Sequence, residues 1–155
     1  MYQHTDLGEL AVAIFRVNSS LLAWGDRFGA PWELTSARWQ ILGALARAMP
    51  EQLTAPQIAE AMGISRQGVQ KQLNHLLAQG LVQSLDNPAH KRSYLYALTE
   101  TGKTTFHQID QAFSHISTEW QNALNPAQLS EFTALLNAWQ GLIESDHFSH
   151  KKEHE

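Results

Sequence analysis

Between Ser65 and His75 the sequence gathers side chains that can hydrogen-bond to base edges and to phosphate groups. Arginine and lysine pair with phosphates or with guanine, whereas glutamine and asparagine meet bases through their amide groups. The stretch contains no carboxylate, which phosphates would repel. The candidate contact residues are Ser65, Arg66, Gln67, Gln70, Lys71, Asn74 and His75. Their chemistry is that of nucleic-acid recognition.

The spacing around these residues predicts two short helices joined by a tight turn. Thr54 and Gln57 have the spacing of a capping box, which begins a first helix. Gly63 allows the positive φ of a turn, and Ser65 can cap a second helix. The apolar residues of that second helix recur at the steps of one helical face and are Val69, Leu73, Leu76 and Leu77. With Gly80 closing the second helix, the pattern predicts a helix-turn-helix with an outward polar face.

The segment after Gly80 changes from a helical to an extended pattern. The runs LVQSL and SYLYAL flank the turn-rich sequence DNPAHKR, which predicts a two-stranded hairpin with Tyr94, Tyr96 and Leu98 on one strand face. The residues at or beside the loop tip are His90, Lys91 and Arg92. A basic hairpin directly after a helix-turn-helix is the layout of a winged helix-turn-helix, in which the wing contacts phosphates or a minor groove.

Composition and charge limit the class of protein. At 155 residues and 43% hydrophobic composition, the chain can bury one substantial core. The formal net charge of −4 opposes phosphate binding, but residues 64–93 hold four Lys or Arg against one carboxylate, so the local field favours DNA there. The chain has no cysteines, no run approaches a membrane span, and the N-terminus lacks a signal-peptide pattern. We therefore expect a cytoplasmic protein without disulfides.

Long amphipathic helices are predicted at both ends of the chain. Apolar residues follow helical steps from residue 5 to about residue 28, and Thr99 and Asn125 can begin two further helices. The surplus apolar surface of these helices predicts a partner, and a symmetric dimer needs only one self-complementary patch. The expected interface residues are Leu7, Leu10, Ile14, Phe113, Trp120, Leu135 and Trp139.

Three motifs in this order resemble the multiple antibiotic resistance regulator (MarR) family of winged helix-turn-helix transcription regulators. They are LTSARWQILGAL at 34–45, LTAPQIAEAMGISRQGVQKQLNHLLAQGLV at 53–82 and YALTETGK at 96–103. The resemblance implies a mainly α fold: an N-terminal dimerisation helix, a DNA-binding lobe with a two-stranded wing, and C-terminal dimerisation helices. The corresponding boundaries are 1–33, 34–100 and 101–146, followed by a flexible tail at 147–155.

The resemblance also implies a function for this fold. A homodimer would place two recognition helices in successive major grooves of a near-palindromic operator, as a ligand-responsive repressor, with the residues from Ser65 to Asn74 and wing Arg92 at the DNA. His90 and Ser84 depart from the family pattern, in which an aspartate and an arginine are usual at those positions. A small aromatic or anionic effector would bind in a crevice for which the candidate residues are Arg16, Trp24, Phe28, Trp32 and Trp39.

Three other functions compete with this interpretation. The sequence lacks a phosphate-binding glycine loop, a nucleophile elbow and a carboxylate pair, so we expect no enzyme and no cofactor. A metal sensor would use the tail, but a solvated tail is favoured and no metal site is predicted. The tail residues in question are Asp146, His147, His150 and His154, with His107 and His115 on the preceding helix. A winged protein-interaction module without DNA binding is consistent with the net acidity and with Ser84 and His90.

Overall fold

The computed structural model describes residues 6–149, with side chains through residue 145. By contacts the chain divides into two compact units, one that ends at Asp110 and one that begins at Gln111, so the division falls inside a single long helix. Ten elements follow one another along the chain. They are α1 (Asp6–Gly29), the 3-10 helix η1 (Ala30–Trp32), α2 (Ser36–Ala48), β1 (Leu53–Thr54), α3 (Ala55–Met62), α4 (Arg66–Ala78), β2 (Val82–Leu85), β3 (Leu95–Leu98), α5 (Glu100–Ala123) and α6 (Pro126–Ser149).

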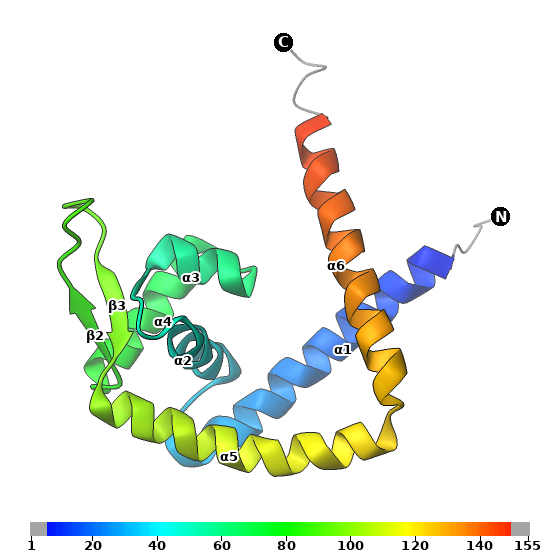
Figure 1. Ribbon diagram of the computed structural model, residues 1–155, viewed down its shortest axis with the longest axis horizontal. Helices are drawn as coiled ribbons and strands as arrows, with labels where there is room; N and C mark the ends of the chain where they lie inside the picture. Colours follow the sequence, from blue (N-terminus) through cyan, green and yellow to red (C-terminus); the bar gives the residue numbers. More distant parts are fainter. Residues whose placement is uncertain (1–5, 150–155) are drawn as a thin grey trace. The chain divides into compact units, whose positions relative to one another are not determined.

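The fold is mainly helical with a small antiparallel sheet, which confirms the predicted winged helix-turn-helix class. Helices α2, α3 and α4 pack on one another, and the β2–β3 hairpin lies against α4 and α2 (Figure 1). The expectation of only two strands was incomplete, because the sheet has three strands in the order β1-β3-β2. β1 pairs Leu53 with Tyr96 and Thr54 with Leu95. A strand of two residues is too short to show a periodic pattern in the sequence.

The core of the first unit is built from the inner faces of these elements. Ile41 and Leu42 of α2, Ile58 of α3 and Leu73 of α4 are fully buried at 0% exposure, as is Ile109 of α5. The predicted apolar stripe of the second hairpin helix is therefore confirmed as its buried side, with Leu77 only partly buried at the edge of the cluster. Each of these large aliphatic side chains contributes roughly 1.5–3 kcal/mol by leaving water.

The start of α2 is held by a side chain of α1 and by its own N-cap residue. Asp26 of α1 accepts a hydrogen bond from the backbone N–H of Ser36 at 2.7 Å, and the Thr35 hydroxyl accepts one from the N–H of Arg38 at 3.4 Å. Two of the orphan donors at the start of α2 are thereby satisfied by side chains. Within this unit, α1 is therefore fixed to the N-terminus of α2.

One described stretch is more apolar than we expected. Asp6–Trp32 is long and hydrophobic enough, by length and composition only, to cross a membrane, with a mean hydropathy of 1.2 and none of the window buried. The expectation that no run approaches a membrane span was wrong for this stretch. Apolar residues on α1 that remain exposed are Leu7, Val12, Phe15, Val17, Leu21 and Leu22. A helix with this much uncovered apolar surface needs a partner surface.

The join between wing and α5 depends on Thr99 and Gly102. The Thr99 hydroxyl donates to the carbonyl of Gly80 at 2.6 Å and accepts from the N–H of Gly102 at 3.0 Å, while the N–H of Thr99 donates to the carbonyl of Leu81 at 3.1 Å. Thr99 therefore caps α5, as predicted, and also holds the end of the wing against the segment after α4. A Cβ on Gly102 would lie 1.9 Å from the carbonyl oxygen of Leu81.

Because that contact is with backbone, Gly102→Ala should lower the free energy of unfolding by about 1–3 kcal/mol. Urea unfolding followed by circular dichroism measures this change. Gly141→Ala on α6 is the matched control, since a Cβ there meets nothing within 4 Å. Alanine is the better helix former, so the control should be more stable by up to about 1 kcal/mol. Equal stability of Gly102→Ala and the unaltered chain would contradict the close approach.

Candidate nucleic-acid interface

Helix α4 separates its side chains into a buried face and an exposed polar face. Val69, Leu73 and Leu76 are 0% exposed and fix the rotation of the helix against α2 and α3. All the predicted contact residues of this region are exposed: Ser65, Arg66, Gln67, Gln70, Lys71, Asn74 and His75. A face of hydrogen-bonding and cationic groups without a carboxylate is therefore presented to solvent.

The local structure around the turn follows from the capping residues. The hydroxyl of Thr54 accepts from the N–H of Gln57 at 3.4 Å, and the Gln57 side chain accepts from the N–H of Thr54 at 2.8 Å, so the predicted capping box is confirmed. Gly63 ends α3 with a φ of 63°, in the left-handed region that glycine adopts without strain. Ser65 then caps α4, because its hydroxyl accepts from the N–H of Gly68 at 3.1 Å.

The wing is a hairpin whose tip carries the basic residues. β2 and β3 pair from Val82 opposite Leu98 to Leu85 opposite Leu95. The side chain of Asn87 accepts from the N–H of Ala89 at 3.0 Å and so turns the chain toward the tip. The tip residues are exposed: His90, Lys91 and Arg92.

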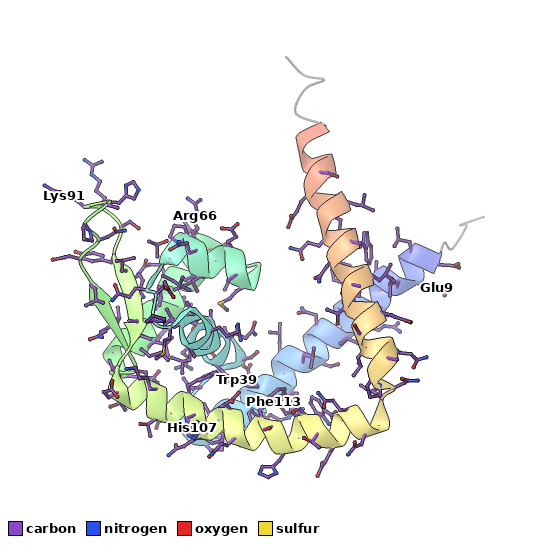
Figure 2. All side chains as sticks on the ribbon, in the orientation of Figure 1. Glu9, Trp39, Arg66, Lys91, His107 and Phe113 are labelled. Carbon is purple, nitrogen blue, oxygen red and sulfur yellow. The ribbon has the colours of Figure 1, made fainter. Side chains whose placement is uncertain are left out.

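Within the first unit, which ends at Asp110, Figure 2 shows Lys91 and Arg66 at the same edge and His107 at the opposite edge.

Two features of the wing differ from the sequence-based expectation. Tyr94 does not share the buried strand face of Tyr96 and Leu98, because it precedes β3 and is 57% exposed. A hollow of about 400 Å³ lies along the wing and is lined by Asp86, Asn87, Pro88, Lys91, Ser93 and Tyr94. Although His90 replaces the family's usual aspartate, a carboxylate therefore still lines the same hollow as Lys91. Ser84 is exposed on β2.

The wing and α4 are also joined by a hydrogen bond that the sequence did not predict. The amide nitrogen of Gln70 donates to the hydroxyl of Tyr96 at 3.3 Å and to the side-chain oxygen of Asn74 at 3.1 Å. Gln70 and Asn74 are one helical turn apart, so their contact follows from spacing. Tyr96 is 26 residues away from Gln70 and could be assigned to this group only from the folded structure.

The aromatic residues that were expected to line an effector crevice form a cluster. The rings of Trp24 and Phe28 stack at 4.8 Å, and Phe28 lies 5.1 Å from Trp39 and 5.8 Å from Trp32. The indole N–H of Trp32 donates to the side-chain oxygen of Gln108 at 3.3 Å. Arg16 is exposed on α1. The structure thus brings the four aromatic residues together.

A shallow hollow of about 380 Å³ adjoins this cluster at one residue only. It is lined by Pro31, Trp32, Glu33, Gln79, Leu81 and Thr105. Gln79 is the residue that follows α4, and its side-chain nitrogen donates to the backbone carbonyl of Glu33 at 3.2 Å. The hollow therefore lies against the C-terminal end of α4.

The residues expected at a dimer interface retain apolar surface in the single chain. Leu7 of α1 is 53% exposed and Leu135 of α6 is 54% exposed. Trp120 is 39% exposed and meets Phe113 edge to face, with ring centroids 6.5 Å apart. The remaining expected interface residues are partly buried: Leu10, Ile14, Phe113 and Trp139.

Metal ligands do not gather in the described part of the chain. Among those residues there is no group of three or more His, Cys, Asp or Glu that could hold a metal ion. His107 and His115 are exposed on α5. The tail proposed as an alternative metal site lies outside the described side chains and comprises Asp146, His147, His150 and His154.

Comparison with known proteins identifies relatives of both sequence and fold. A family model described as the MarR family matches residues 32–93. An uncharacterized protein of Mycobacterium tuberculosis is 32% identical over 124 residues, which cover 80% of this chain and 85% of the relative. AbsC, a MarR family transcriptional regulator from Streptomyces coelicolor, has a similar structure with a TM-score of 0.79, 20% identity and coverage of 94% and 99% of the two chains. A mutant MarR from E. coli complexed with operator DNA has a TM-score of 0.74, 22% identity and coverage of 86% and 94%.

Two substitutions of Ser65 test its role as the N-cap of α4 separately from its expected role in DNA binding. Ser65→Ala removes the cap and should lower the free energy of unfolding by about 1 kcal/mol, whereas Ser65→Asp keeps a capping oxygen and should stay within about 0.5 kcal/mol of the unaltered chain. Urea unfolding measures both. In a DNA titration the order of the two variants should reverse. Ser65→Asp should bind DNA more weakly than Ser65→Ala, because the aspartate repels phosphates. Equal stability of the alanine variant and the unaltered chain would contradict the capping role.

Proposed function

Since the chain belongs to the MarR family of transcription regulators, we propose that it is a homodimeric, ligand-responsive repressor that binds a near-palindromic operator in double-stranded DNA. The observation that carries this proposal is the exposed polar face of α4, which has no carboxylate and belongs to the same unit as a basic wing. The related MarR from E. coli was crystallised with operator DNA, which supports DNA as the ligand.

In this proposal α4 enters the major groove, which is about 12 Å wide and accepts one α-helix. Arg66 and Lys71 supply positive charge near phosphates or guanine, while the amides of Gln67, Gln70 and Asn74 meet base edges. Ser65 can donate its hydroxyl proton to a phosphate while its oxygen still caps the helix. His75 lies on the same exposed face and completes the set.

The wing adds a second contact in the adjacent groove or on its phosphates. Lys91 and Arg92 are exposed at the tip of the hairpin and can reach a phosphate without burying other charges. The net charge of −4 means that these few cations must supply most of the attraction, since the rest of the protein repels DNA. Removing one such cation should therefore lower the affinity for DNA by a measurable amount.

Dimerisation explains the uncovered apolar surface of the terminal helices. Exposed leucine, phenylalanine and tryptophan side chains on α1, α5 and α6 would be covered by a second copy through one self-complementary patch. Two copies of α4 related by a two-fold axis would then read two half-sites about one helical turn apart. A near-palindromic operator follows from that symmetry.

An effector would act by binding one arrangement of the two copies better than the other. The aromatic cluster with Trp24, Phe28, Trp32 and Trp39 is our candidate for stacking on a small aromatic molecule, and Arg16 for pairing with an anionic group. The protein would be cytoplasmic, where its DNA is. The family and the fold are those of transcription regulators and not of enzymes.

Salt dependence tests DNA binding most simply. On a duplex selected from a random pool by the purified chain, log K should fall steeply with log salt concentration. Lys71→Ala and Arg92→Ala should each reduce the slope by about 0.9 per protomer, or nearly 2 per dimer, if each cation meets one phosphate. Fluorescence anisotropy measures the affinities.

Lys103→Ala is the matched control, because it removes one positive charge from α5, where Lys103 pairs with Glu100 at 2.6 Å. The control should leave the slope unchanged. A flat salt response together with no enriched sequence would contradict DNA binding and favour a protein-interaction module.

The oligomeric state is a separate prediction. Light scattering should give a mass of about twice 17.4 kDa for the unaltered chain. Leu135→Asp places a charge in the apolar surface of α6 and should shift the mass to that of a monomer at the same concentration. Ser130→Asp, on the same helix and also exposed, should remain dimeric. A monomeric unaltered chain would contradict the proposed homodimer.

A further inference from the structure

The amide of Gln70 is held in place by hydrogen bonds to two neighbours. Its nitrogen donates to the hydroxyl of Tyr96 at 3.3 Å and to the side-chain oxygen of Asn74 at 3.1 Å. A glutamine amide nitrogen carries two hydrogens, so both donors are used inside the protein. Rotating the Gln70 amide alone by half a turn would place its oxygen against the oxygen of Asn74. Because the Tyr96 hydroxyl can donate as well as accept, the two amides turn only together, and in either sense the pair keeps one free donor and one free acceptor.

This arrangement leaves one hydrogen-bond acceptor and one donor available to a molecule outside the protein. Within the described chain, the side-chain oxygen of Gln70 and the side-chain nitrogen of Asn74 have no hydrogen bond to another residue. Both residues lie on the exposed polar face of α4. Gln70 thus offers an acceptor, and Asn74, one turn further along, offers a donor.

Among the four bases, adenine presents the complementary pair in the major groove, with the N6 amino group as donor and N7 as acceptor. Guanine presents two acceptors, so its O6 would face the oxygen of Gln70. Thymine presents an acceptor and a methyl group, and cytosine presents a donor alone. We propose that Gln70 and Asn74 together read one adenine in each half-site, and that Tyr96 is the positioning residue that holds the Gln70 amide in place. This inference rests on the proposed function.

Tyr96 is well placed to hold the Gln70 amide. It is 4% exposed and lies in β3, the central strand of the sheet, where it pairs with Leu53 on one side and Ser84 on the other. A side chain that is buried on a strand paired on both sides loses little further freedom when DNA binds. The wing strand therefore contributes to base reading without touching the base.

The experiment compares base preference among variants by selection from random duplexes, followed by competition between four duplexes that differ at one base pair. Gln70→Ala identifies that base pair as the position where preference is lost. There the unaltered chain should prefer adenine, and Tyr96→Phe should reduce the preference roughly threefold to tenfold, the worth of one hydrogen bond. The salt slope should stay unchanged, because no phosphate contact is lost.

Tyr94→Phe is the matched control, since it removes a hydroxyl from the same hairpin at an exposed residue outside the hydrogen-bonded group. It should leave the preference intact. Asn74→Ala, on the exposed face, provides a second variant should Tyr96→Phe not fold, and should also reduce the preference for adenine. An unchanged preference in Tyr96→Phe and Asn74→Ala, or a preference for guanine at this position, would overturn the inference and leave DNA binding intact. Absence of any sequence preference in the unaltered chain would overturn both.

Discussion

The burial of one apolar stripe of α4 determines which side chains of that helix reach solvent. Val69, Leu73 and Leu76 leave no exposed surface, and they pack in one cluster with Ile41 and Ile58. Rotating the helix to expose any of them would cost roughly 1.5–3 kcal/mol for each side chain. The polar face is therefore held outward by the core, so the DNA contact that we propose needs no rotation of the helix.

The wing, in the same unit, is held in place by hydrogen bonds and by close backbone packing. Thr99 bonds to the carbonyls of Gly80 and Leu81, and Gly102 has no Cβ to clash with Leu81, so the wing returns to the end of α4 at a fixed place. Tyr96 then adds a side-chain link to Gln70 from the central strand. The position of the wing and that of the Gln70 amide, which we propose reads a base, consequently depend on the same short hairpin.

Local chemistry could be predicted from the sequence, and long-range contacts could not. The Thr54 capping box, the turn at Gly63 and the cap at Ser65 depend on residues within a few positions, and all are confirmed. The third strand and the Tyr96 contact depend on partners far along the chain, for which spacing carries no signal. The surplus apolar surface of the terminal helices was predicted. The second copy that we propose covers this surface lies outside the single chain that the structure describes.

Under the proposed function, the exposed face of α4 lies in the major groove of an operator. Because the chain contains no cysteine, Gln67→Cys provides one unique site on that face for a DNA-cleaving iron chelate. On the selected duplex, the labelled protein should cleave two clusters of nucleotides about 10 base pairs apart, one for each protomer. Cleavage no stronger than that produced by the same label at Ser130→Cys on α6 would contradict the placement of α4 in the major groove.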